Sequence, residues 1–361
     1  MKRLSFTIIL LITLLTINLA VSEVYPLTAD FSNIQDVLYL KDGNILYSKY
    51  EGNNETPNVN RVLNKIICVD STGKQTWECS IPAFCYSPFS SLLELPNECF
   101  AYLGRKDDGA FSVLTISKNG ELIKEYILPE EISTPILLSD GVLYISAKEN
   151  IIKKWFWNET IISPEPNSVF NRLSKAETIS NRTYISAISN DKHVLLCIDE
   201  AGNELWNYSL GTSKGSFVQA WSAHVDNSLV VAFQNNKDTA ADSDTPVHLI
   251  EINNGKKKWE TELSYYPSTI RVQLLLHNND NSYDLFGRLD ENHGICVSVA
   301  QDGSVIECAT INAHYVDFVQ YKKDIYAIEY NTEGTVSPVS FVNYNLLSKD
   351  SFNQLTVYNV N

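Results

Sequence analysis

After its first 22 residues, the sequence lacks long hydrophobic runs and the apolar periodicity of helices. No later segment approaches the roughly 18 apolar residues of a membrane-spanning helix. Apolar residues occur in short runs broken by Gly, Asn and Asp, as in β-strands joined by turns. We therefore expect an all-β protein without a stable membrane span.

The sequence also lacks the short motifs of common catalytic and cofactor sites. HExxH, GxSxG, the Walker loop, GxGxxG and CxxC are all missing. No two of the six histidines have a short metal-binding spacing, and we interpret each as a surface or strand residue. These are His193, His224, His248, His277, His293 and His314. We therefore assign no catalytic or cofactor-binding residue.

Basic residues are scarce, with 28 Lys and Arg against 43 Asp and Glu, so the net charge is −15. A surplus of negative charge favours solubility and repels polyanions. We therefore do not expect nucleic acid or an anionic membrane surface as a partner.

Residues 1–22 have the three parts of a secretory signal peptide, which are basic, apolar and small in turn. Cleavage after Ser22 would remove Lys2 and Arg3 and leave 339 residues, 23–361, with a net charge of −17. An uncleaved anchor is the alternative. We expect a secreted, extracellular monomer.

The seven cysteines are an odd number, so at least one stays unpaired in a monomer. Cys68, Cys197 and Cys296 each lie in an apolar strand, where a free cysteine acts as a small core residue. Disulfides Cys68–Cys79 and Cys296–Cys308 would join the strands of one hairpin. Counting outward from the turns places neither pair directly opposite.

One hairpin pattern recurs along the chain: an apolar strand, a polar turn ending in glycine, and a second strand. Three copies, Leu195 to Leu210, Ile66 to Trp77 and His248 to Trp259, have a tryptophan four residues after the glycine. Two weaker copies have Lys124 and Glu307 at that position.

The turn glycines lie at a regular spacing, at positions 73, 120, 202, 255 and 303. The one double interval predicts a missing hairpin near residue 160, and Ile151 to Ile162, turning at Asn158-Glu159, supplies it. A period of 40 to 50 residues is typical of propellers and solenoids, and a solenoid would need capping units, which the sequence lacks.

We therefore predict a single β-propeller of about seven four-stranded blades over residues 23–361. The predicted blades are 31–81, 88–129, 132–168, 172–211, 216–263, 270–311 and 313–360.

The recurring Asp-x-x-Gly-x-x-x-Trp hairpin resembles the PQQ-like (quinoprotein-type) propeller repeat. The matching residues are Asp70, Gly73 and Trp77, then Asp199, Gly202 and Trp206, and, with a shorter turn, Asn253, Gly255 and Trp259. The family includes quinone-dependent dehydrogenases, which hold calcium and often have an adjacent-cysteine disulfide, and cofactor-free scaffolds. This chain has no Cys-Cys pair and no group that aligns with the calcium ligands, so the resemblance implies a cofactor-free member.

Two polar loops have side chains that calcium prefers, although neither has the EF-hand spacing. They contain Asp238, Asp242 and Asp244, and Asn278, Asn279, Asp280 and Asp284. We favour the interpretation that both are solvated, flexible loops. We expect no cofactor, with calcium left open.

Trp155 and Trp157 alternate onto one face of a strand, opposite Phe156. If exposed, they could stack on a sugar ring or on an apolar patch of a partner. If buried, they replace the missing repeat tryptophan between blades, which is the interpretation we favour.

The predicted function is that of a non-catalytic scaffold that binds a protein or an extracellular polymer. The alternative is a propeller enzyme, either a quinone-linked dehydrogenase or a carbohydrate-active enzyme that uses carboxylates at the channel mouth. The absence of catalytic motifs favours the scaffold.

Overall fold

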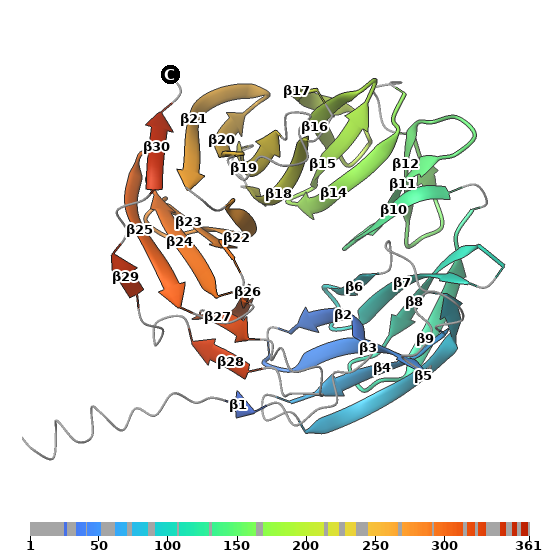
Figure 1. The fold of residues 1–361 in the computed structure, drawn as a ribbon. Coiled ribbons are helices and arrows are strands. Elements are labelled where there is room, and N and C mark those ends of the chain that lie inside the picture. The colour runs from blue at the N-terminus through green and yellow to red at the C-terminus, as the bar shows by residue number, and fades with distance from the viewer. Residues whose placement is uncertain are drawn as a thin grey trace, which may run out of the picture.

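The computed structural model has β-sheets arranged around a central opening (Figure 1). It describes residues 25–26, 34–40, 42–51, 62–70, 74–85, 91–106, 108–129, 132–163, 169–212, 216–223, 228–235, 245–265, 269–290, 292–312, 316–321, 324–329, 340–343, 349–351 and 355–359. These residues form thirty strands and no helix, so none of them belongs to a helix able to cross a membrane. The all-β prediction is confirmed. The predicted signal peptide lies outside the described residues.

Two sheets contain four consecutive antiparallel strands each. The first holds β10 (Ile132–Leu138), β11 (Gly141–Ser146), β12 (Ile152–Phe156) and β13 (Ile161–Ile162). The second holds β14 (Arg172–Ile179), β15 (Arg182–Ser189), β16 (Lys192–Asp199) and β17 (Glu204–Thr212).

Two further sheets have four consecutive strands and a fifth strand from the C-terminal end of the chain. One holds β18 (Ser216–Ala223), β19 (Ser228–Asn235), β20 (Val247–Asn253), β21 (Lys256–Tyr265) and β30 (Leu355–Asn359). The other holds β22 (Arg271–His277), β23 (Tyr283–Arg288), β24 (His293–Val299), β25 (Val305–Asn312) and β29 (Lys349–Ser351).

An eight-stranded sheet contains two groups of four strands. The first group is β2 (Ile34–Tyr39), β3 (Ile45–Glu51), β4 (Val62–Val69) and β5 (Gln75–Cys85). The second is β6 (Ser91–Glu94), β7 (Phe100–Lys106), β8 (Phe111–Ile116) and β9 (Leu122–Ile127). The groups join where Phe84 and Cys85 of β5 pair with Lys106 and Arg105 of β7.

The sixth sheet unites the two ends of the chain. It holds β26 (Val316–Tyr321), β27 (Asp324–Glu329), β28 (Ser340–Asn343) and β1 (Tyr25–Pro26). The sequence predicts one self-contained unit over 313–360, and the structure differs, because β29 pairs with β25 and β30 with β21. Since β1 occupies the free edge of β28, the C-terminal strands pair with outer edges elsewhere.

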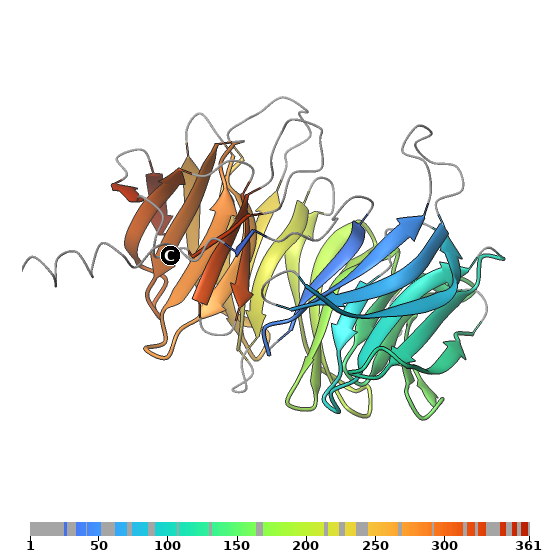
Figure 2. The ribbon, with the colours of Figure 1, turned by 90° about the horizontal axis from the view of Figure 1, so that it is seen from below.

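The first strand of each four-strand group lies nearest the central opening (Figure 1). Contacts join these innermost strands in the order β2, β6, β10, β14, β18, β22 and β26. Because the four strands alternate in direction, every innermost strand begins at the same end of the ring, here called the start end (Figure 2). The repeat turns lie at the opposite end, here called the turn end. This arrangement is a β-propeller.

Each repeat tryptophan packs against the turn glycine of the next group of strands. The pairs are Trp77 with Gly120, Trp206 with Gly255, and Trp259 with Gly303. A Cβ atom on these glycines would lie 2.5, 2.8 and 2.7 Å from the nearest tryptophan atom, and their φ angles are +83°, +74° and +86°. Glycine is therefore required twice, for the turn and for the close contact.

An ion pair replaces this contact where the repeat departs from the pattern. Lys124 stands in the tryptophan position, and Glu159, with φ +66°, stands at the turn of the next hairpin. The Lys124 Nζ atom lies 2.9 Å from Glu159 Oε1 and 4.1 Å from the centre of the Tyr126 ring. The two substitutions therefore compensate for each other across the boundary between sheets.

The three strand cysteines are buried, as predicted: Cys68, Cys197 and Cys296 are 1%, 0% and 7% exposed. Burial raises the pKa of the Cys197 thiol to about 12. Cys68 lies opposite Trp77 and Cys296 opposite Ala309, and neither of the two disulfides considered from the sequence is formed.

We predict that Gly303→Ala destabilises the protein by about 2 to 4 kcal/mol, because the new methyl group meets Trp259 and the positive φ becomes strained. Gly211→Ala is the matched control, since Gly211 has φ +108° and an added Cβ atom there would meet no atom within 4 Å. It should cost about 1 kcal/mol, from backbone strain alone. Equal losses in urea denaturation would contradict the packing role of Gly303.

Candidate functional site

Five innermost strands have a β-bulge near the start end of the ring. Their pairing registers shift between Ile34 and Val37, Ser133 and Ile136, Leu173 and Lys175, Val218 and Ala220, and Val272 and Leu274. A bulge leaves a residue out of the regular pairing and redirects its side chain. Three of the redirected side chains, Thr134, Gln219 and Gln273, reach the backbone of a following innermost strand.

These bulge side chains accept backbone hydrogen bonds across the sheet boundaries. Leu173 N donates to Thr134 Oγ1 at 3.2 Å, and Val272 N donates to Gln219 Oε1 at 2.7 Å. Phe318 N likewise donates to Gln273 Oε1 at 3.3 Å. The polar side chains near the axis therefore fix the spacing of successive sheets.

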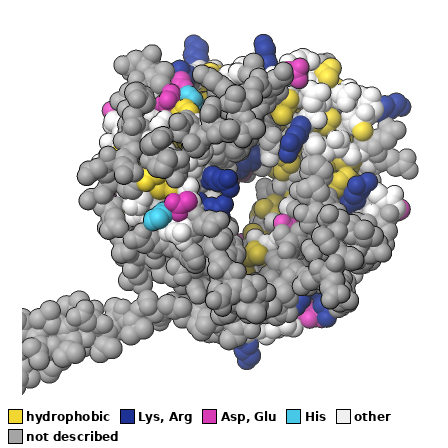
Figure 3. Space-filling view, in the orientation of Figure 1, with side chains coloured by type: hydrophobic (Ala, Val, Ile, Leu, Met, Phe, Trp, Pro, Cys, Tyr) yellow, Lys and Arg dark blue, Asp and Glu magenta, His cyan; other side chains and the backbone are white. Residues whose placement is uncertain are grey.

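Lys and Arg side chains border the central opening in the space-filling view (Figure 3). Arg172 and Arg271 are the first residues of the innermost strands β14 and β22, and both are exposed. A cationic rim in a chain of net charge −15 can attract an anionic group locally.

Lys175 lies on β14 with its ammonium group above an aromatic ring. Its Nζ atom is 5.2 Å from the centre of the Trp221 ring, whose Nε1 donates to Glu177 Oε2 at 2.9 Å. Burial lowers the pKa of Lys175, and the Glu177 charge opposes this shift. The three side chains link β14 with β18, the innermost strand of the next sheet.

Asp36, on the innermost strand β2, has a carboxyl group in an unusual environment. Burial raises the pKa of its carboxyl group to about 7. Its Oδ2 atom is buried and has no hydrogen-bond partner in the described part of the chain, while its backbone N donates to Ser48 Oγ at 3.1 Å. A carboxyl group that titrates near neutrality is suited to proton transfer.

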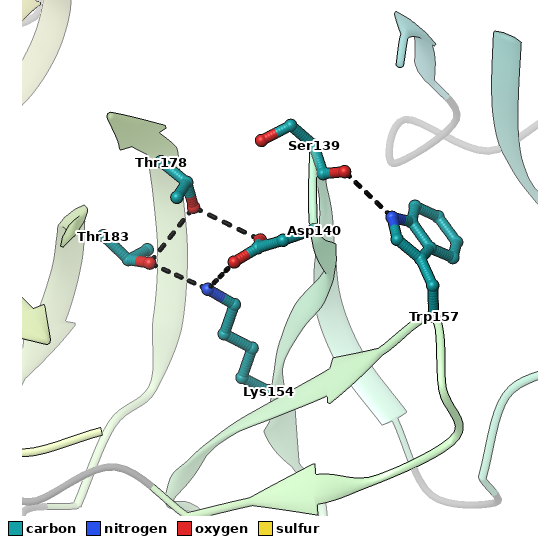
Figure 4. A network of polar contacts seen from close by, with 6 residues as sticks. All are labelled: Ser139, Asp140, Lys154, Trp157, Thr178 and Thr183. Carbon is teal, nitrogen blue, oxygen red and sulfur yellow. Dashed lines mark hydrogen bonds and ion pairs between the residues drawn. The ribbon is translucent and has the colours of Figure 1, made fainter. Parts of the chain in front are cut away.

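A buried lysine joins two neighbouring sheets in a polar network at the turn end (Figure 4). Lys154, only 2% exposed, lies 2.6 Å from Asp140 Oδ2 and donates to Thr183 Oγ1 at 2.9 Å. Thr178 completes the network, with its hydroxyl 3.4 Å from Asp140 Oδ1 and 3.1 Å from Thr183 Oγ1. Its satisfied, interior geometry is that of a structural crosslink.

The structure places the predicted tryptophan pair between sheets. Trp155 is 4% exposed, and its ring centre lies 5.4 Å from that of Trp157 and 5.2 Å from that of Tyr126. Trp157 Nε1 donates to the Ser139 carbonyl oxygen at 2.9 Å. Trp155 is therefore buried, as in the interpretation we favour, and Trp157 is half-buried against the same cluster.

Side chains in one of the two polar loops considered for calcium bond to one another. Asn278 Nδ2 donates to Asp284 Oδ2 at 2.9 Å, and Ser282 Oγ donates to Asp280 Oδ1 at 2.6 Å. The residues Asp238, Asp242 and Asp244 of the other loop lie outside the described residues. Within the described ranges, no three His, Cys, Asp or Glu residues form a group that could hold a metal ion.

The described histidines have separate local contacts. His193 Nε2 lies 2.7 Å from Ser186 Oγ, and His248 Nδ1 lies 2.9 Å from Glu260 Oε1. His293 Nδ1 lies 2.8 Å from Asp290 Oδ1, and His277 stacks on a tyrosine ring. His224 and His314 lie outside the described residues.

Sequence reasoning missed Asp36, Lys175 and Gln219, because none of them belongs to a motif. The first strands of these units mix polar and apolar residues, as in RLSKAETI of β14, so nothing in the sequence distinguishes these three side chains from their polar neighbours. The bulges, which determine where these side chains point, leave no signal in the sequence either.

We predict that Asp140→Asn destabilises the protein by about 3 kcal/mol, because it leaves the buried Lys154 ammonium without its carboxylate. The double variant Asp140→Asn/Lys154→Met should recover part of this loss. The control Glu98→Gln breaks the exposed Lys118–Glu98 pair and should leave the urea midpoint unchanged. A double variant as unstable as the sum of its single variants would contradict the network.

Because the pKa of Asp36 is raised above its ordinary value of 3.8 to about 7, its ionisation opposes folding. We predict that its contribution lowers the free energy of unfolding as the pH rises from about 4 to about 7, and then levels off. Asp36→Asn should therefore be more stable than wild type at pH 8 by a few kcal/mol, since one pKa unit corresponds to about 1.4 kcal/mol. At pH 4 this advantage should vanish.

Urea denaturation at five pH values between 4 and 8 measures this difference. Asp302→Asn, at an exposed turn, is the control and should retain the wild-type slope between pH 4 and 7. A wild-type slope in Asp36→Asn would assign the pH dependence to other groups.

Comparison with known proteins finds similarity in structure alone. No protein-family model matches the chain, and no curated protein matches it. Streptogramin B lyase superposes with a TM-score of 0.52 at 14% identity, over 91% of this chain and 97% of the lyase. A catalytically inactive virginiamycin B lyase from Staphylococcus aureus, solved with quinupristin, has a TM-score of 0.50 at 12% identity, over 89% and 98%. The Cps50 (Swd1) β-propeller domain from Myceliophteria thermophila has a TM-score of 0.51 at 7% identity, over 86% and 96%. At these identities the likeness is one of fold: the chain is similar to β-propellers.

Proposed function

We propose that this chain is a secreted, non-catalytic propeller of seven blades that binds a protein or an extracellular polymer. It would be a cofactor-free relative of the PQQ-like propellers. The count of seven treats the two four-strand groups of the eight-stranded sheet as separate blades, which their small shared edge at β5 and β7 supports.

The contrast between two kinds of polar side chain around the axis carries this proposal. Thr134, Gln219 and Gln273 are engaged in hydrogen bonds between sheets, so they hold the ring in shape. Arg172 and Arg271, at the start end, are exposed instead. A rigid ring with exposed charges at one end is suited to binding, because little order is lost when a ligand docks.

The alternative, an enzyme with an axial site, is favoured by one observation. Asp36, whose Oδ2 atom is buried, has a carboxyl pKa raised to about 7, and it lies on an innermost strand. Such groups occur at catalytic sites, although structural sites also perturb pKa values.

The full sequence, including residues 1–22, is expressed, and the protein is recovered from the culture medium. Its N-terminal sequence should begin at Glu23. Neutral polysaccharides, oligosaccharides with one uronate group and a peptide library are tested for binding by interferometry and for products by mass spectrometry. We expect saturable binding with the ligand unchanged. Products formed by wild type and lost in Asp36→Asn would establish the enzyme instead.

A further inference from the structure

Two arginines lie directly opposite each other at the start end of the ring. Arg271, the first residue of β22, pairs with Arg288, the last residue of β23. Like charges directly opposite in an antiparallel pair are destabilising. Neither guanidinium has an ion pair with a described residue, and Asp290, two positions beyond Arg288, is paired with His293.

The backbone on both sides of Arg271 is fixed from the preceding sheet. Gln234, 2% exposed, donates from Nε2 to the Ile270 carbonyl oxygen at 3.2 Å. On the other side, Val272 N donates to Gln219 Oε1 at 2.7 Å. These two hydrogen bonds hold the main chain that carries Arg271.

Glycines shape the other faces of this site. A Cβ atom on Gly287 would lie 2.6 Å from the Arg271 carbonyl oxygen, so only glycine allows β23 to approach this closely. Gly294 pairs with Arg288 from the third strand, and the Phe318 ring fills the space where a Cβ atom on Gly294 would lie, 2.8 Å away, so the neighbour on this side is apolar and offers Arg288 no charge. The structure thus holds two positive charges close together, and no described residue forms an ion pair with either of them.

The position of Arg271 makes it accessible from the channel. It is exposed, and it is the first residue of an innermost strand, at the start end of the ring. A ligand that reaches the mouth of the ring can therefore contact it.

We propose that Arg271 and Arg288 form a binding site for an oxyanion group, a carboxylate or a phosphate, on the ligand of this ring. The site rests on the binding function proposed above and specifies the chemistry of its ligand. Arginine offers paired N–H donors that match both groups. An anion bound between two guanidinium groups is attracted to each of them and offsets their mutual repulsion. Because the net charge of −15 repels polyanions, the ligand presents a single such group.

The test measures melting temperature and calorimetric binding with sodium malonate or inorganic phosphate, at an ionic strength held constant with sodium chloride. We expect wild type to be stabilised by at least one anion, and Arg271→Gln and Arg288→Gln to bind it at least tenfold more weakly. Without added anion, both variants should melt at the wild-type temperature or above it, because the repulsion is relieved. If the two arginines only stabilised the fold, the substitutions would lower the melting temperature.

Arg105→Gln is the matched control. Arg105 also lies near the end of the second strand of its group, but its Nε donates to the Gly109 carbonyl oxygen at 3.3 Å and its guanidinium lies 6.0 Å from the Phe111 ring centre. This variant should bind the anion as wild type does.

The outcomes separate the source of the group and the two proposals. A response to malonate alone indicates a carboxylate ligand, and a response to phosphate alone indicates a phosphate ligand. No response in wild type, or equal responses in wild type and both variants, would overturn the site and leave the scaffold function standing. Anion binding lost in the variants, together with turnover by wild type, would retain the site and refute the non-catalytic function.

Discussion

The structure depends on the contact between each repeat tryptophan and the turn glycine of the next group of strands. Sheets packed radially need a filler where they diverge toward the rim, and an indole ring supplies it only if the facing turn has no Cβ atom. The Lys124–Glu159 pair shows the same constraint met by different chemistry, since a change on one side coincides with a change on the other. The repeat pattern therefore reflects contacts between successive hairpins rather than contacts within one hairpin.

Nearer the axis the constraint is polar. Bulges in the innermost strands send Thr134, Gln219 and Gln273 toward the following strand, where they accept its backbone N–H groups. Because these three side chains are engaged between sheets, they are not free to bind a ligand. The opposed arginines at the start end differ from them in chemistry and in having no such bond to a described residue.

The outer part of the fold was predictable because turns and repeats are local. The regular spacing of the five turn glycines predicts the ring, and the double interval between Gly120 and Gly202 predicts its irregular hairpin at Ile151 to Ile162. The pairing of β29 and β30 was not predictable, because the choice among free sheet edges depends on where β1 lies. The candidate site was equally hidden, since the opposition of Arg271 and Arg288 follows from strand register, and the environment of Asp36 follows from burial.

The strands β29 and β30 have a consequence for the order of assembly. A chain synthesised from its N-terminus completes β18 to β21 about a hundred residues before β30 exists. Until then the outer edge of β21 offers unpaired backbone groups to any neighbouring strand. The strands β29 and β30 therefore cover the outer edges of β25 and β21 late in synthesis. A chain truncated before these strands would expose both edges, through which incomplete chains can associate.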